Sequence, residues 1–265
     1  MDESTLYTDP ALYDRIFPTA HGTWSTRDEV RKQRMISCED FYVSEAKRSG
    51  GPVLELACGS GRLTVPIAQN GSEILGVDLS AAMLDAARAK AVTAGVQIQF
   101  VQGDMRKLEL PGRFTAVLIP GNSLLHLLTN DDLKECVARV RGHLADGGRL
   151  VFDVSQWDPR QFVQNPLKRC PTFSLHDPLL GEITIDETET YDAAEQTLNV
   201  VWYLSASGAT DFKIIRYRLR VIYPQELLFL LEGAGFRLEA RYGEFTREPF
   251  ESASPRQVCI CSRRA

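Results

Sequence analysis

Short strand-like segments alternate with helical ones along residues 53–154, and this alternation constrains the fold more than any other feature of the chain. The predicted strands lie at 53–56, 73–77, 98–101, 114–119 and 149–154. The predicted helices lie at 63–69, 80–93 and 131–144. Because strands joined through helices need crossover connections, the sheet should be parallel with helices on its faces. The sequence therefore predicts a doubly wound α/β fold.

A β-rich region interrupts this pattern late in the chain. Strand-like alternation without a helical period is found at 170–175, 182–191, 197–205 and 212–221, which predicts an antiparallel sheet. A helix at 224–233 and strands at 236–242 and 256–262 then resume the α/β pattern. We therefore divide the chain into an N-terminal helical segment (1–48), a main domain (49–164 and 223–265) and an inserted cap (165–222).

Composition narrows the class of protein. The 265 residues are 44% hydrophobic and 25% charged, which is enough to bury a full core, and the net charge is -5. This acidic balance disfavours a nucleic-acid partner, and no apolar stretch approaches the roughly 20 residues needed to span a bilayer. Six scattered cysteines without metal-ligand spacing are typical of reduced thiols. We expect a soluble, cytoplasmic protein without a metal site or a membrane partner.

The first strand runs into a glycine loop, Glu55-Leu56-Ala57-Cys58-Gly59-Ser60-Gly61. Two glycines one residue apart allow a sharp turn and close approach of a ligand, at the edge where open α/β sheets bind nucleotides. Asp78 ends the next strand about 20 residues further on, where a carboxylate can accept hydrogen bonds from both ribose hydroxyls. The structural alternatives are a tight turn for the loop and a helix N-cap for Asp78, although Ser80 is an equally good cap.

The residue at the third position of the loop bears on the cofactor class. Dinucleotide-binding loops carry a third glycine or alanine, so that the helix packs closely and its N-terminus meets the pyrophosphate. Thr64 holds that position here, and its branched side chain makes such packing harder. The loop therefore disfavours NAD. An NAD-dependent oxidoreductase and a non-catalytic nucleotide-binding regulatory protein stay open as alternatives.

Four motifs resemble, in order and spacing, those of the class I S-adenosylmethionine-dependent methyltransferases, which share a Rossmann-like sheet. They are Glu55–Gly61, Gly76–Ser80, Gly103–Met105 and Pro120–Leu124. The resemblance implies S-adenosylmethionine as cofactor and S-adenosylhomocysteine as product. One departure is Ala57, where many members have glycine, and its methyl group should tighten the loop slightly.

The same resemblance implies a role for each residue of the cofactor site. The amino-acid end is held by Glu55, Ala57, Gly59 and Gly61, and the ribose by Asp78. The adenine is flanked by Leu79 and Met83, and its edge is contacted by Asp104 and Met105. Gly103 belongs to the same cofactor site. The sulfonium lies beside Pro120, Gly121 and Asn122. Taken singly, several of these residues are equally explained as turn, core or cap residues.

The cap and the N-terminal segment indicate that the methyl acceptor is a small molecule. The cap and the segment Leu6–Asp14 resemble those of methyltransferases that act on sugar amines and simple amines, in which they cover substrate and cofactor. Tyr7 and Tyr13 are candidates to line the sulfonium, because aromatic faces attract cations, although they would also anchor a terminal helix. His126 is the best candidate for a general base, and its alternative is a helix-start residue without a chemical role.

The cap offers aromatic and charged candidates for acceptor contacts at Trp157, Trp202, Tyr203, Arg216 and Tyr217. Alternate strand residues face opposite sides, so some of these should point away from the pocket. The acceptor atom stays open among nitrogen, oxygen and carbon, and the favoured acceptor is a small molecule with a nitrogen or oxygen nucleophile. An RNA or protein acceptor is disfavoured by the acidic balance. The protein should be a monomer or a homodimer.

Overall fold

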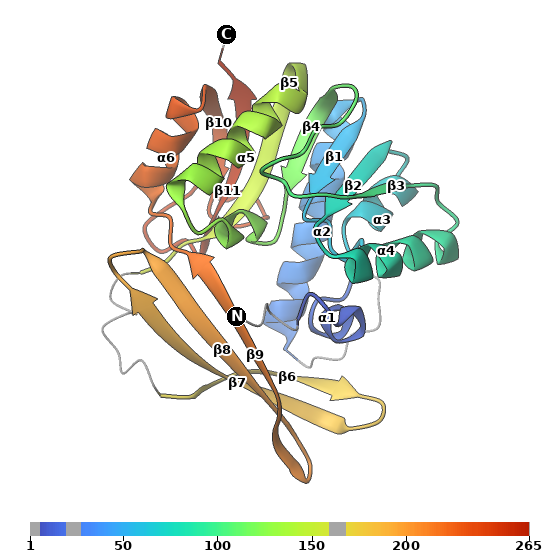
Figure 1. The fold of residues 1–265 in the computed structure, drawn as a ribbon, viewed down its shortest axis with the longest axis vertical. Helices are drawn as coiled ribbons and strands as arrows, with labels where there is room; N and C mark the ends of the chain where they lie inside the picture. Colours follow the sequence, from blue (N-terminus) through green and yellow to red (C-terminus); the bar gives the residue numbers. More distant parts are fainter. Residues whose placement is uncertain (1–5, 20–27, 159–167, 265) are drawn as a thin grey trace.

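The structure is a computed structural model that describes residues 6–19, 28–158 and 168–264. Within these ranges a central sheet lies between helices, and a second sheet lies apart from it along the chain's later part (Figure 1). The elements are α1 (Pro10–Ile16), α2 (Glu29–Ser49), β1 (Val53–Leu56), α3 (Thr64–Gln69), β2 (Ile74–Asp78), α4 (Ala81–Thr93), β3 (Gln99–Gln102), β4 (Phe114–Ile119), η1 (Ser123–His126), α5 (Asn130–His143), β5 (Leu144–Ser155), β6 (Cys170–Asp177), β7 (Gly181–Asp192), β8 (Thr197–Ala206), β9 (Ala209–Arg220), α6 (Pro224–Gly233), β10 (Phe236–Tyr242) and β11 (Arg256–Arg263).

The central sheet has the strand order β10-β11-β5-β4-β1-β2-β3. β1 pairs in parallel with β2 on one side and with β4 on the other. β11 runs antiparallel between β5 and β10. Strands β2 and β3 therefore extend the sheet on one side of β1, and the chain then returns to add β4 and the later strands on the other side. The carboxyl ends of β1 and β4 border this switch point, which is where open α/β sheets bind their ligands. The predicted doubly wound fold is confirmed.

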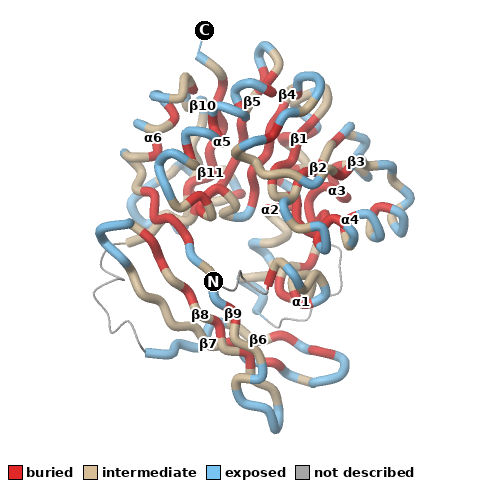
Figure 2. Tube along the Cα trace, in the orientation of Figure 1, coloured by how far each residue is buried: buried red, intermediate tan, exposed pale blue. Residues whose placement is uncertain are grey.

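Helices cover the two faces of the central sheet and bury its apolar strands. One core cluster joins α2 and α3 to strand residues such as Val53 and Leu118, and another joins α5 and α6 to their neighbours such as Leu54 and Val117. Alternate residues of one strand thus serve opposite cores, as the two-residue strand period requires. Figure 2 shows the central strands buried along most of their length. No helix in the described ranges combines the length and apolarity needed to cross a bilayer.

The second sheet is antiparallel, in the order β6-β7-β8-β9, and it is the sheet of the inserted cap. Its inner face is apolar and packs against the N-terminal residues Leu6, Leu12 and Ile16. Helix α1 contacts both α4 and β6, so it links the main domain to the cap (Figure 1). Leu6 and helix α1 therefore lie between the main domain and the cap.

Two elements differ from the sequence prediction. α1 is a short helix without a hydrophobic periodicity that would have predicted it. It starts at Asp9, whose side chain accepts a hydrogen bond from Leu12 N at 3.0 Å, and Pro10 lies in its first turn. β5 begins at Leu144 rather than Arg149, because Leu144 already pairs with Phe114 of β4 and a register shift follows. The helix before it therefore joins the strand with no intervening loop.

Two glycines in contrasting surroundings test this packing. A Cβ on Gly76, in the middle of β2, would lie 2.8 Å from a ring carbon of Phe100 and 2.9 Å from Cys58 Sγ. A Cβ on Gly142, in α5, would meet nothing within 4 Å. We expect Gly76→Ala to lower the free energy of unfolding by about 1–3 kcal/mol through overpacking. Gly142→Ala should raise it by about 0.5–1 kcal/mol through helix propensity.

Thermal melting of both variants beside the wild type measures the difference. Because the two substitutions add the same methyl group, each serves as the control for the other. A Gly76→Ala protein that melts at or above the wild-type temperature would contradict the described packing between β2 and β3.

Candidate active site

The loop after β1 is built from residues in the left-handed backbone region. Its φ angles are 55° at Ala57, 55° at Gly59 and 77° at Gly61. Glycine adopts this region freely, whereas a left-handed alanine costs about 1–2 kcal/mol. The methyl group of Ala57 therefore strains the backbone conformation, which is a larger constraint than the slight tightening that the sequence predicted.

Asp78 holds this loop against the neighbouring strand. The parallel pairing of β1 with β2 places Leu56 beside Val77, and Cys58 N donates to Val77 O at 2.9 Å. Gly59 N then donates to Asp78 Oδ2 at 2.8 Å, and Ser80 N donates to Asp78 Oδ1 at 2.8 Å. Burial raises the pKa of Asp78, although these N–H donors oppose the rise. The N-cap of α4 is Ser80, so the cap alternative for Asp78 is wrong.

Glu55 is a buried carboxyl at the end of β1, with a relative exposure of 3%. Thr64 Oγ1 donates a hydrogen bond to Glu55 Oε2 at 2.6 Å. Burial raises the Glu55 pKa to about 7, opposed by the Thr64 hydrogen bond and by the charge of Arg62. Thr64 is the loop residue that disfavours NAD, and this hydrogen bond shows that it also orients Glu55.

The predicted adenine residues gather at the end of β2. Gly103 N donates to Asp78 O at 3.0 Å, which brings the loop of Asp104 and Met105 beside the glycine loop. The Asp104 carboxylate is paired with Arg106 at 2.6 Å, and this hydrogen bond lowers the Asp104 pKa.

The two apolar candidates for flanking the adenine lie in different surroundings. Leu79 is 63% exposed, an apolar side chain left at the surface beside the loop, while Met83 is fully buried. Met83 therefore also fits its alternative as a core residue of α4.

A second loop, after β4, borders the same edge of the sheet. Gly121 and Asn122 have φ angles of 69° and 65°. The fully buried Asp153 of β5 accepts hydrogen bonds from Gly121 N at 2.8 Å and from Tyr42 Oη at 2.6 Å. Asn122 Oδ1 accepts from Ser155 N at 2.7 Å. β5 thus fixes the loop of Pro120–Asn122 that the resemblance places beside the sulfonium.

Tyr7, Tyr13 and His126 lie together although they are far apart in the sequence. Tyr7 Oη and His126 Nε2 are 2.8 Å apart, with their rings in a T-shaped arrangement, and the Tyr7 and Tyr13 ring centroids are 6.2 Å apart. Tyr13 also covers the glycine loop, because a Cβ on Gly59 would lie 3.7 Å from its hydroxyl oxygen.

Burial sets the protonation of this aromatic group. It lowers the His126 pKa to about 4, and it raises the Tyr7 pKa above its usual value. Both groups are therefore neutral near pH 7, and the tautomer of His126 sets which of them donates the hydrogen bond.

The strand register sorts the cap residues between the two faces. Trp202 and Tyr217 lie on the inner face and contact each other edge to face. Tyr203 and Arg216 lie on the opposite face, where Arg169 stacks on the Tyr203 ring. Tyr203 and Arg216 are therefore the candidates whose side chains point away from the inner face, as expected for some of the five. Trp157 packs between the main core and the inner face.

Sequence reasoning did not single out four charged residues of this region. Asp153 interrupts an otherwise apolar strand, which is a readable signal for a buried charge. Glu187 and Glu189 alternate along β7 on the face of Trp202, and Glu187 Oε2 accepts from Trp202 Nε1 at 2.5 Å. Arg62 directly follows the second glycine of the loop and is 8% exposed.

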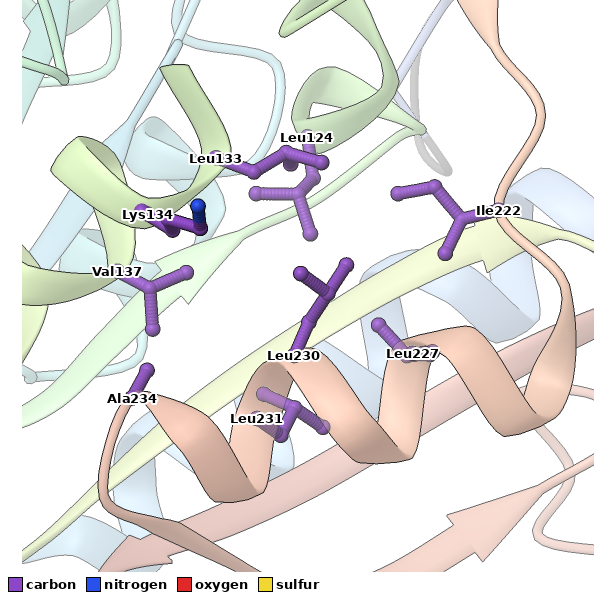
Figure 3. A pocket seen from close by; sticks show the side chains of 9 residues that line it. All are labelled: Leu124, Leu133, Lys134, Val137, Ile222, Leu227, Leu230, Leu231 and Ala234. Atoms are coloured by element: carbon purple, nitrogen blue, oxygen red, sulfur yellow. The ribbon is translucent and has the colours of Figure 1, made fainter. Parts of the chain in front are cut away.

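A cavity elsewhere in the molecule does not belong to this site. It lies between α5 and α6, holds about 20 Å³ and is lined mainly by leucines such as Leu227, Leu230 and Leu231 (Figure 3). This volume is close to that of a single water, far below what a nucleoside needs. It is a packing gap of the core. Among the described residues, no three His, Cys, Asp or Glu side chains gather as a metal site would require.

Proteins related in sequence are described as methyltransferases. A family model described as a methyltransferase domain matches residues 53–148. An uncharacterized methyltransferase of Bacillus licheniformis is 30% identical over 193 residues, which cover 68% of this chain and 89% of that protein. A Bacillus subtilis protein named as a methyltransferase is 41% identical over 134 residues, half of this chain. The chain spans 54% of that protein's length and 41% of a similarly named Geobacillus protein.

Solved structures extend the likeness to the whole chain. The CcbJ methyltransferase from Streptomyces caelestis aligns with a TM-score of 0.80 and 27% identity over all of both chains. CalS10, an amino pentose methyltransferase from Micromonospora echinaspora solved with S-adenosylmethionine bound, shares the fold with a TM-score of 0.67 at 20% identity, covering 89% of this chain and 95% of that one.

A doubly wound sheet with left-handed glycines and a strand-ending acid at its switch point defines a protein that binds a nucleoside-containing cofactor. The chain belongs to the class I S-adenosylmethionine-dependent methyltransferases, and S-adenosylmethionine is its cofactor. The NAD-dependent and non-catalytic alternatives are set aside. The residues fit this cofactor. An added Cβ at Gly59 or Gly121 would meet no atom closer than 3.7 Å, and the carboxylate of Asp78 lies at the end of β2 beside the loop.

The predicted ribose role of Asp78 leads to a binding experiment. We expect Asp78→Asn to weaken S-adenosylhomocysteine binding roughly 10- to 100-fold, because it removes charge-assisted hydrogen bonds worth about 1.5–3 kcal/mol. Isothermal titration calorimetry measures the change, and Asp85→Asn, at an exposed position of α4 paired with Arg88, is the matched control. Unchanged affinity in Asp78→Asn would remove Asp78 from the cofactor site.

Proposed function

We propose that this protein transfers the methyl group of S-adenosylmethionine to the nitrogen of a small-molecule amine held between the cap and the main domain. The observation that carries this proposal is a pair of carboxyl groups, Glu187 and Glu189, on the inner face of the cap. That face otherwise meets the N-terminal segment with apolar and aromatic side chains.

The strand register puts the acidic pair on the same face of the cap as Tyr217. Glu189, Val200 and Tyr217 form one row across β7, β8 and β9, and adjacent paired residues share a face. Burial raises the pKa of Tyr217, and the nearby Glu187 and Tyr7 raise it further. The two glutamates, Tyr217 and Tyr7 therefore lie within electrostatic reach of one another.

This combination of groups suits a cation. Carboxylates pair with an ammonium group, and the faces of tyrosine and tryptophan attract one. A neutral alcohol would leave two half-buried carboxyls without a counter-charge, which is unfavourable. Nitrogen is therefore favoured over oxygen as the atom that accepts the methyl group. The amino pentose acceptor named for CalS10 is consistent with this preference.

The amine must lose a proton before its lone pair can attack. Burial, followed by repulsion from Glu187, raises the Glu189 pKa to about 7, so this carboxyl can receive a proton near neutral pH. Burial lowers the His126 pKa to about 4, and its Nε2 is already hydrogen-bonded to Tyr7, so Glu189 is the better receiver. When bound, S-adenosylmethionine supplies an activated methyl group, and the chain's main tasks are alignment and exclusion of water.

The acceptor class can be tested directly. Purified protein is incubated with isotopically labelled S-adenosylmethionine and two matched panels, primary and secondary amines on one side and the corresponding alcohols on the other. We expect labelled methyl groups on members of the amine panel, detected by mass spectrometry, and none on their alcohol partners. Transfer to alcohols alone would overturn the nitrogen assignment, and transfer to protein or RNA alone would overturn the small-molecule assignment.

The pH dependence tests the acidic pair. With an amine acceptor, kcat/KM should rise as the pH passes upward through about 7, because ionised Glu189 binds the ammonium group and accepts its proton. Glu189→Gln should lower kcat/KM roughly 10- to 100-fold and remove this rise. Glu182→Gln, on the exposed outer face of β7, is the control and should keep the wild-type profile. An unchanged profile in Glu189→Gln would show that the acid group lies outside the acceptor site.

A further inference from the structure

Arg62 is a buried cation with an incomplete set of partners. It is 8% exposed, and its Nη1 is buried with no hydrogen-bond partner among the residues that the structure describes. Its Nη2 reaches the thiol of Cys38 at 3.9 Å, and its guanidinium also hydrogen-bonds with Tyr13. Burial raises the pKa of both partners, so neither of them supplies a negative charge. Although burial acts to lower its pKa, the neighbouring Cys38 and Tyr13 raise it, so the guanidinium stays charged. A buried charge without a counter-ion is strongly destabilising, so the geometry calls for an anion that the chain itself does not supply.

The surroundings of Arg62 place this missing anion at the cofactor site. Arg62 follows Gly61 directly in the loop after β1, and a Cβ on Gly121 would lie 4.0 Å from its Nη2. The guanidinium therefore lies between the two loops that end β1 and β4. Tyr13, which covers Gly59, lies on the same side, because the Arg62 charge acts to lower its pKa against the effect of burial.

Glu55 supplies the opposite charge without satisfying Arg62. The Glu55 carboxyl bonds to Thr64, and no ion pair joins it to Arg62 within the described part of the chain, although the two influence each other's pKa. Two opposite charges that are buried close together and yet unpaired match a ligand that carries both charges itself. An α-amino acid group has this pattern, with an ammonium for Glu55 and a carboxylate for Arg62.

We propose that Arg62 binds the α-carboxylate of the methionine part of the cofactor and that Arg62 and Glu55 together hold its amino-acid group from two ends. A guanidinium presents parallel N–H donors that suit a carboxylate, and the unpartnered Nη1 provides one of them. This proposal rests on the cofactor and not on the identity of the acceptor. Its failure would therefore leave the amine assignment untouched.

Two ligands that differ only in the amino-acid part test the role of Arg62. S-adenosylhomocysteine carries the carboxylate, and 5′-methylthioadenosine lacks the whole amino-acid group. We expect Arg62→Gln to weaken S-adenosylhomocysteine binding at least 30-fold by calorimetry and to change 5′-methylthioadenosine binding less than 3-fold. Arg62→Lys should lie between Arg62→Gln and the wild type. The control is Arg139→Gln, at an exposed position of α5, which should alter neither ligand.

The outcome that overturns the proposal is an equal loss for both ligands, or no loss for either. Arg62→Met keeps the side chain's length without its charge, and its melting temperature without ligand reports whether the fold survives. A measurement on the wild-type protein covers the case in which no Arg62 variant folds. The carboxamide of S-adenosylhomocysteine, which lacks the negative charge, should bind the wild type at least 10-fold more weakly than S-adenosylhomocysteine, and equal affinity would overturn the proposal.

Discussion

The hydrogen bond from Gly59 N to Asp78 is the interaction on which the rest of the site depends. The loop between β1 and α3 places Ala57, Gly59 and Gly61 in the left-handed region, a conformation that a free chain would leave readily. The parallel pairing of β1 with β2 puts a carboxylate where it accepts the loop's N–H, and the sheet thereby maintains the strain. The positions of Glu55 before the loop and Arg62 after it follow from this one anchor.

The loop after β4 is fixed in the same way but from the other side of the switch point. Asp153 accepts the N–H of Gly121 from within the core, and Tyr42 of α2 hydrogen-bonds the same carboxylate. Both loops that border the cofactor site are thus held by a carboxylate that belongs to an adjacent strand. The strands position these carboxylates, and the carboxylates in turn position the loops. These hydrogen bonds restrict the motion that a glycine-rich loop would otherwise have, and they do so without a bound ligand.

The sequence predicts what depends on local pattern and misses what depends on three-dimensional neighbours. The helix at 224–233 begins at Pro224, and the strand at 236–242 follows as expected, because capping and periodicity are local signals. Alternation shows that Trp202 and Tyr203 face opposite sides, but the register with β9 is needed to tell which side is the inner one. The sequence does not predict the burial of Arg62, because arginine side chains are mostly solvent-exposed. Its burial arises from Tyr13 and Cys38, which come from elements distant in the chain.

The electrostatics of the enclosed region follow from one cause, which is that burial has shifted its groups toward neutrality. The Glu55 and Glu189 pKa values lie near 7 and that of His126 near 4, in each case mainly because burial disfavours the charged form. Arg62 is the exception, since an arginine stays protonated in proteins. Carboxyls that are half protonated in the free protein become good partners for the ammonium of the cofactor and of the proposed amine, and ligand binding then favours their ionised forms. The two glutamates are in this way matched to the positive charges of the cofactor and of the proposed amine, and Arg62 is matched to the carboxylate that we propose it binds.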